Sequence, residues 1–244
     1  MNPTPAYERF RQSQVPCFDQ WHDGTGFDQA AIAEMTPAER VTVRRQLAGV
    51  QATWREIEAL EVLRDHAAAH PEENGVEPAG HELTPRGGEA VRQIDRATAR
   101  AAASGERDTR LAAAETLHRQ GKLPEMDKVI AREISDNMET VADGCVRALR
   151  LAEAFPTPAV KQALLYASNF RNETAMHCAA LLCYLCGKAK EPFDWSMRPF
   201  FLKFHADSNS LTRGEAMAEL QAMTGLTLQE PDTFLHASDS SEGK

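Results

Sequence analysis

The chain is a succession of helix-forming segments, and patterns that would form β-strands are almost absent. β-branched and aromatic residues are sparse, and no stretch alternates apolar and polar residues for long, as a half-buried strand would. Ala, Leu, Glu and Arg, which are among the strongest helix formers, dominate instead. These two features predict an all-α fold.

The first well-marked helix begins after Thr36. Thr36 and Glu39 have the spacing of a capping box, and Pro37 stands at the first helical position, so we expect a helix from there to about Leu47. A second helix is expected to start near Thr53.

In residues 54–70, apolar side chains recur at spacings of three and four, which gives the second helix one buried face. Pro71 ends it. Residues 71–88 hold three prolines, four glycines and four glutamates. This composition predicts a loop or short insertion rather than a packed element.

After residue 88 the chain divides into helices of similar length, separated by short breaks that contain Gly, Pro or capping residues. We expect helices over 89–103, 108–120, 124–135, 138–154, 157–168 and 172–186. Taken in pairs, they form hairpins with equivalent positions roughly 30 to 35 residues apart. Segments 110–117 and 174–182 both resemble second helices of such pairs. The pattern predicts an irregular HEAT/armadillo-like α-solenoid of stacked helical hairpins, with a compact all-α bundle as the alternative.

We expect one all-α domain over 1–244. Its parts are N-terminal helices (1–70), a loop or insertion (71–88), a helical-repeat core (89–187), a C-terminal capping segment (188–235) and a flexible tail (236–244). The helix 172–186 is apolar on nearly every side, which predicts a central position. The aromatic-rich segment 191–204 is expected to cover it, and a last helix over 211–224 ends at Gly225.

Charge limits the partners that the chain can attract. The net charge is −9, so binding of nucleic acid along a broad face is disfavoured. Residues 51–143 hold 19 acids and 12 bases and therefore carry −7 of the −9. This excess is interpreted either as a set of solvated helix faces or as a landing site for a basic partner.

Several features indicate a cytoplasmic protein. The longest stretch free of charge, 174–187, is shorter than the roughly 20 residues that span a bilayer. The N-terminus lacks the basic cluster and apolar run of a secretory signal. Five cysteines, an odd number in a long chain, argue against a disulfide framework.

Cysteine and histidine pairs are the candidates for chemistry. Cys178, Cys183 and Cys186 have a spacing used by some iron–sulfur proteins, but they fall in a helical run and are expected to pack as small hydrophobes. His66 and His70 are four residues apart, as metal ligands on a helix can be, yet no third ligand is arranged around them, so a solvated helix end is favoured. We expect no metal and no cofactor.

Two further groups of residues are candidate sites, and neither of them requires the chain to be an enzyme. His177 could act as a base for Cys178, but adjacent helical residues do not face each other, and a buried, hydrogen-bonded histidine is favoured. Between Asp194 and Arg198 we expect Asp194 to cap a helix and Arg198 to pair with a carboxylate. The alternative is a contact point for a partner, because Trp195 and Arg198 are of the residue types that dominate binding hot spots.

Both ends of the chain resemble a family of HEAT-like helical proteins of bacteria, some of which are encoded beside polymorphic or type VI secreted toxins. The segments that carry the resemblance are RNETAMHCAALL (171–182), GKAKEPFDW (187–195), RPFFLKF (198–204), WHDG (21–24) with Phe27 and Asp28, and WREIEAL (54–60). The resemblance implies an immunity protein that binds and neutralises a cognate toxin, with no catalytic residues.

An acidic binder associates quickly with a basic partner, so a cytoplasm-acting nuclease is the expected toxin. Inhibition would occur by covering the toxin's active cleft or blocking its assembly. The candidate partner-binding residues are Glu115, Glu139, Asp143, Arg147 and Glu173. The main alternative is a non-catalytic HEAT-like scaffold for protein–protein interaction, and an enzyme on an α-solenoid, such as a chromophore lyase, is a third hypothesis.

Overall fold

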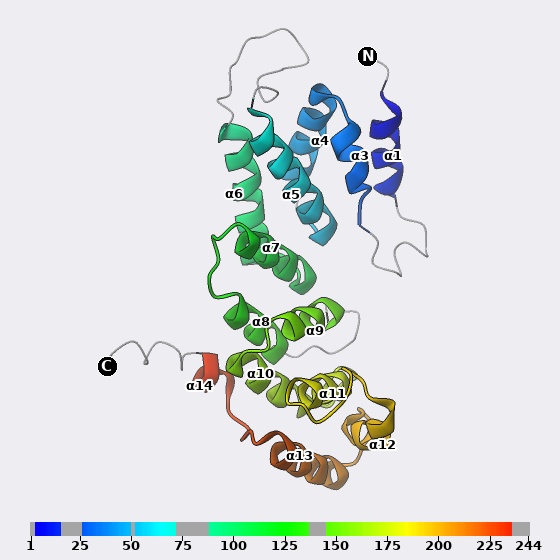
Figure 1. The fold of residues 1–244 in the computed structure, drawn as a ribbon, viewed down its shortest axis with the longest axis vertical. Coiled ribbons are helices and arrows are strands. Elements are labelled where there is room, and N and C mark those ends of the chain that lie inside the picture. The colour runs from blue at the N-terminus through cyan, green and yellow to red at the C-terminus, as the bar shows by residue number, and fades with distance from the viewer. Residues whose placement is uncertain (1–2, 16–25, 50–51, 72–87, 137–144, 236–244) are drawn as a thin grey trace, which may run out of the picture. The chain divides into compact units, whose positions relative to one another are not determined.

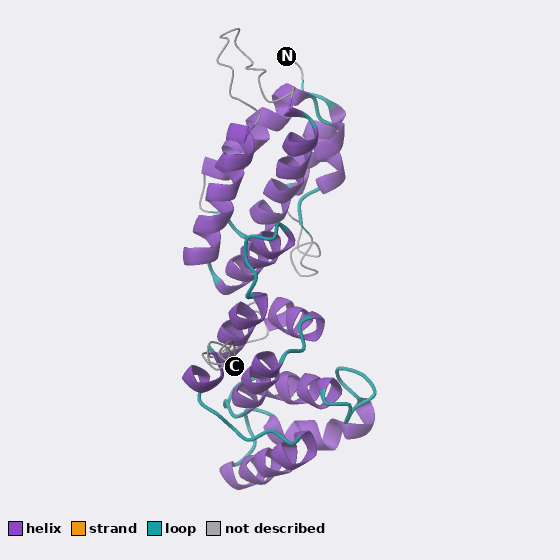
Figure 2. Cartoon of the chain, turned by 60° about the vertical axis from the view of Figure 1, so that its left-hand side comes forward, coloured by secondary structure: helices purple, strands orange, loops and turns teal. Residues whose placement is uncertain are grey.

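The described part of the chain consists of helices joined by loops. The computed structural model describes residues 3–15, 26–49, 52–71, 88–136 and 145–235. No strand occurs among them (Figure 2). The all-α prediction is therefore confirmed. The chain divides into two compact units, Met1–Leu123 and Pro124–Lys244, and each is considered by itself.

The first unit is built from six described helices. They are α1 (Pro5–Ser13), α3 (Gln29–Glu34), α4 (Pro37–Gly49), α5 (Trp54–Ala69), α6 (Gly88–Ser104) and α7 (Arg107–Arg119) (Figure 1). Helix α4 packs against α5 and α6, and α5 packs against α6 and α7, which also pack on each other. Helix α1 lies against α3.

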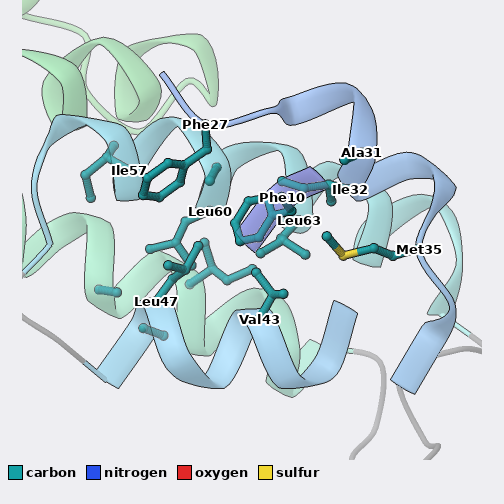
Figure 3. Close-up of a cluster of buried hydrophobic side chains, with 14 of the residues drawn as sticks. Phe10, Phe27, Ala31, Ile32, Met35, Val43, Leu47, Ile57, Leu60 and Leu63 are labelled. Atoms are coloured by element: carbon teal, nitrogen blue, oxygen red, sulfur yellow. The ribbon is translucent and has the colours of Figure 1, made fainter. Parts of the chain in front are cut away.

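One hydrophobic core holds these helices together (Figure 3). Phe10 of α1, Ile32 of α3 and Leu60 of α5 are completely buried. The Phe10 ring meets Phe27 edge to face, with centroids 5.4 Å apart. Ile94 brings α6 into the same cluster, so residues that precede position 72 and residues that follow position 87 share one core.

The two expected helix starts in this unit are confirmed at the atomic level. The backbone N–H of Thr36 donates to the Glu39 carboxylate at 2.9 Å, and the backbone N–H of Glu39 donates to Thr36 Oγ1 at 3.3 Å. Thr53 and Glu56 form a second capping box at the start of α5, which satisfies N–H groups that have no partner within the helix.

The second unit contains nine described helical elements. They are α8 (Met126–Ser135), α9 (Cys145–Ala154), α10 (Pro158–Ser168), α11 (Ala175–Leu185), η2 (Trp195–Met197), α12 (Arg198–Phe201), η3 (Leu202–Phe204), α13 (Ser210–Thr224) and α14 (Pro231–Leu235). Helix α8 packs against α9 and α10, and α11 packs against α9 and α10. Helix α14 lies against α8 and α10.

Helix α11 is the central helix of this unit, as its all-round apolar sequence predicted. It contacts α9, α10, α12, η3 and α13. The aromatic segment covers it as expected, because Phe201 and Phe204 are completely buried where α12 and η3 contact α11. Two glycines, Gly187 after α11 and Gly225 after α13, have φ near +70°, where a side chain would be strained.

Three short helices were absent from the sequence prediction: α1, α3 and α14. Helix α1 carries a recognisable start, since Thr4 Oγ1 accepts a hydrogen bond from the N–H of Tyr7 and Pro5 stands at the first helical position. Helices α3 and α14 have six and five residues, too few for a 3.6-residue period to be read.

Three parts of the predicted organisation stay predictions. The expected loop over 71–88 and the tail over 236–244 lie almost wholly outside the described residues, and so does the first part of the predicted helix 138–154. The assignment of 1–244 to one domain also stays a prediction. Within the described ranges, no helix is both long and apolar enough to cross a bilayer.

Candidate functional site

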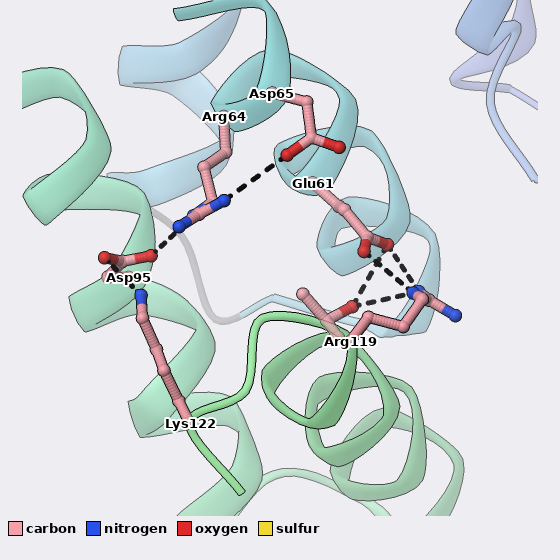
Figure 4. Close-up of polar contacts among 7 residues, drawn as sticks. Glu61, Arg64, Asp65, Asp95, Arg119 and Lys122 are labelled. Atoms are coloured by element: carbon pink, nitrogen blue, oxygen red, sulfur yellow. Dashed lines mark hydrogen bonds and ion pairs between the residues drawn. The ribbon is translucent and has the colours of Figure 1, made fainter. Parts of the chain in front are cut away.

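Two groups of ion pairs connect the helices of the first unit (Figure 4). In the first group, which joins α5 to α7, Arg119 Nε donates to Glu61 Oε1 at 2.9 Å, and Thr116 Oγ1 donates to Glu61 Oε2 at 3.2 Å. A second nitrogen of Arg119 lies 2.9 Å from Glu115 Oε1. Hydrogen bonding to Glu61, despite an opposing effect of burial, raises the pKa of Arg119.

The second group of ion pairs is centred on Asp95 of α6. Arg64 Nε donates to Asp95 Oδ1 at 2.9 Å, and Lys122 Nζ lies 2.5 Å from Asp95 Oδ2. Burial acts to raise the pKa of Asp95, but the hydrogen bonds from Lys122 and Arg64 outweigh it and hold this pKa below its ordinary value. These pairs leave the net charge of residues 51–143 unchanged, because Arg64, Arg119 and Lys122 are already counted among the 12 bases of that range.

The five sequence-predicted partner-binding residues have different environments. Glu115, on α7, is half-buried and paired with Arg119. Arg147 is half-buried on α9, whereas Glu173 is exposed just before α11. Glu139 and Asp143 lie outside the described residues. Glu115 belongs to the first unit and Arg147 and Glu173 to the second. Their role in binding stays a prediction.

The cysteines of the C-x4-C-x2-C run pack as core residues, as expected. Cys178 and Cys183 are completely buried, and Cys186 is partly exposed. Burial raises the pKa of the Cys178 thiol well above its usual value and that of Cys183 to about 12. Within the described ranges, no group of three or more His, Cys, Asp and Glu side chains is arranged to hold a metal ion.

The histidine pair His66 and His70 lies at the end of α5 with ring centroids 4.5 Å apart. His70 is exposed, as a solvated helix end requires, and His66 lines a small pocket between α4 and α5 that Arg40 and Arg44 also line. With space for about one water molecule, the pocket is too small for an organic ligand.

His177 on α11 is half-buried rather than fully buried. Its ring lies 5.7 Å from that of Phe193, and burial lowers its pKa, so the neutral imidazole is favoured. The buried thiol of Cys178 and the neutral ring of His177 therefore do not form an activated nucleophile, because the thiolate is strongly disfavoured.

The segment around Trp195 confirms one expectation and corrects another. Asp194 caps η2, since its Oδ1 accepts from the backbone N–H of Ser196 at 2.9 Å. The pairing of Arg198 with a carboxylate is wrong for the described residues. Its guanidinium instead lies over the Trp195 ring, 5.0 Å from the centroid, because the 195–198 turn places both side chains on one exposed side.

The fold and these surfaces define an all-α protein with two groups of ion pairs on one unit and an exposed aromatic–cation pair on the other. Comparison of the chain with protein-family models, curated proteins and solved structures gave no match. The residues themselves therefore carry every functional argument that follows.

Proposed function

We propose that this chain is an immunity protein, which binds and neutralises a cognate cytoplasm-acting secreted bacterial toxin, and that this toxin is a nuclease. The observation that carries the proposal is the charge distribution, with −7 of the net −9 in residues 51–143. Nucleases have basic substrate clefts, and an acidic partner approaches such a cleft faster than a neutral one. The role requires neither turnover nor a cofactor, and it places the protein in the cytoplasm.

We further propose that the helices form a HEAT/armadillo-like stack. In such a stack, first helices pack on first helices and second helices on second helices. Hairpins α8–α9 and α10–α11 have this pattern, because α8 contacts α10 and α9 contacts α11. Hairpins α4–α5 and α6–α7 repeat it, with contacts of α4 to α6 and of α5 to α7. Equivalent helices in the second unit begin about 30 residues apart.

Inhibition would occur by occlusion, with acidic and apolar side chains covering the toxin's active cleft. Among the three candidate residues that the structure describes, Glu173 is the most accessible, since it is exposed just before the first turn of α11. Glu115 can contribute only by exchanging its pairing with Arg119 for a pairing with the toxin, which reduces the net gain. We therefore expect Glu173 to contribute more to association than Glu115.

The decisive experiment is growth rescue. The product of the gene adjacent to this one is expressed in the cytoplasm with and without the full chain, and the two proteins are then co-purified. Rescue together with a stable complex supports immunity by direct binding, and the toxin's activity identifies its substrate. Continued killing without a complex eliminates the immunity proposal.

Charge variants test the steering argument. Glu173→Lys, and the double reversal of Glu139 and Asp143, should slow association with the toxin and flatten its dependence on salt. Glu215→Lys is the matched control for Glu173→Lys, because Glu215 is exposed on α13 and the two substitutions change the net charge equally. Equal slowing by the control would assign the effect to net charge alone.

The alternative remains a non-catalytic scaffold that joins cellular proteins. Gene context separates the two, because an immunity gene lies beside a toxin gene and a scaffold gene has no need to. A complex with a cellular protein, formed without any toxin, would favour the scaffold.

A further inference from the structure

Trp195 is an unusually exposed indole held in a fixed position. It lies on the short helix η2 and is 65% exposed. The Arg198 guanidinium lies 5.0 Å from the centre of its ring, and the Phe193 ring meets it edge to face at 6.0 Å. Exposed tryptophan and arginine are enriched among residues that dominate protein interfaces.

The residues that precede the indole, Phe193 and Asp194, are anchored in the core of the second unit. Phe193 packs against the completely buried Phe201, with ring centroids 5.4 Å apart, and against His177. Asp194, directly before the indole, accepts hydrogen bonds from the Ser196 hydroxyl at 2.6 Å and from the Lys190 backbone N–H at 3.1 Å. The turn that presents Trp195 is thus ordered before any partner arrives, which lowers the entropic cost of binding.

The charge around the indole is opposite to that of the whole chain. Lys188, Lys190 and Arg198 are exposed within eleven residues, and none forms an ion pair with a described carboxylate. Asp194 is buried beneath the turn and occupied by its three hydrogen bonds. Glu191 is the exposed acid of this stretch, so the surface is positive in a protein of net charge −9.

We propose that Trp195 and Arg198 form a docking site for an acidic peptide segment of a protein partner. One carboxylate of that segment pairs with the outward edge of the Arg198 guanidinium, and a neighbouring apolar side chain packs on the indole. Lys188 and Lys190 add long-range attraction. This site goes beyond the proposed immunity role, because a basic toxin is not attracted to it.

An acidic peptide fits this site better than nucleic acid. The net charge of −9 repels a long polyphosphate, and the basic residues occupy one eleven-residue stretch, 188–198, rather than a broad face. A short peptide places a few carboxylates on the local positive charge and also supplies the apolar group that the indole requires.

The probe is a fluorescein-labelled peptide of alternating Glu and Leu, with a Lys/Leu peptide and an oligo-dT of similar length as comparators. Anisotropy is measured with the full chain. We expect saturable binding of the Glu/Leu peptide only, weakened about tenfold by Trp195→Ala and by Arg198→Glu. Arg198→Lys should recover part of the affinity, because it keeps the charge but loses the fork of N–H donors.

Leu211→Ala is the control for exposed apolar groups, because Leu211 is 74% exposed on α13 and its loss should leave the affinity unchanged. Circular dichroism checks that each variant is folded. Equal binding of the Lys/Leu peptide, preference for oligo-dT, or unchanged affinity in folded Trp195→Ala would overturn the proposal. So would self-association of the chain that Trp195→Ala abolishes while peptide binding is absent. Toxin binding plays no part in these measurements, so they succeed or fail separately from the immunity proposal.

Discussion

Arg213 is a buried cation that donates to four backbone carbonyl oxygens of the second unit. It is 5% exposed on α13, and its Nη2 donates to the carbonyl oxygens of Phe204 at 2.7 Å and His205 at 2.8 Å. Its Nη1 donates to the carbonyl oxygens of Ser168, at the end of α10, and Phe170. One side chain therefore ties α13 to the ends of α10 and η3.

Arg213→Met should destabilise the protein by about 3 kcal/mol, because it leaves buried carbonyl groups without donors. Urea denaturation measures the change. Lys203→Met is the matched control, since Lys203 makes a half-exposed pair with Glu219 and should cost less than about 1 kcal/mol. Equal effects of the two substitutions would contradict the role assigned to Arg213.

Asp95 predicts a pH dependence of stability. Because its pKa in the folded chain lies below its ordinary value, its ionised form stabilises the fold above the unfolded-state pKa. That contribution is lost as the pH falls through the folded-state pKa. Asp95→Asn should therefore cost about 1.5 kcal/mol at pH 7, with the difference from the parent protein shrinking below about pH 4.

Asp65→Asn is the comparison for Asp95, because Asp65 pairs with the same Arg64 but is 69% exposed. Its substitution should change little at any pH. Denaturation curves at several pH values measure both variants. A constant Asp95→Asn difference between pH 7 and pH 3 would show that the effect is not electrostatic.

At the scale of single elements, α1 shows why sequence periodicity missed short helices. The nine residues of α1 hold two buried positions, Ala6 and Phe10, so there is no repeating face to detect. Its position depends on Phe10 entering a core supplied by α3 and α5. Phe10→Ala should cost about 3–5 kcal/mol by thermal or urea unfolding, whereas Val15→Ala, at a residue 79% exposed, should cost almost nothing. Similar costs would mean that α1 is not docked.

Helix starts were predictable wherever a side chain marks them. Thr36 and Thr157 accept hydrogen bonds from the N–H groups three residues on, as their sequence positions indicate. The starts of α7 and α8 were misplaced by one or two residues, because Glu106 and Glu125 stand at the N-cap without a side-chain hydrogen bond. A cap defined by backbone geometry alone leaves no mark in the sequence.

The Trp195–Arg198 pair was predictable in residue type and not in geometry. Composition identified the segment as a possible contact point, but a carboxylate was expected beside Arg198. The cation–aromatic stack arises from the turn 195–198, whose side-chain directions depend on three-dimensional packing over Phe193. The ion pairs of Glu61 and Asp95 were missed for the same reason, since Arg119 and Lys122 are distant in the sequence from the carboxylates that they pair with.

At the scale of the whole molecule, the two compact units raise the question of how many folding units the chain contains. The first unit has its own core, from Phe10 to Ala113, and the second has its own around α11. The boundary between Leu123 and Pro124 falls between two helical hairpins. A continuous helical repeat array could show the same boundary, because each hairpin in such an array contacts only its neighbours.

Expressing Met1–Leu123 and Pro124–Lys244 separately distinguishes these possibilities. We expect each fragment to be helical by circular dichroism and to unfold cooperatively, because each holds a buried core of its own. The full chain is the control, and its denaturation curve should then resemble the two fragment curves combined. A fragment that is unfolded alone but folds when its counterpart is added would contradict this expectation and support one continuous domain, in which the units stabilise each other.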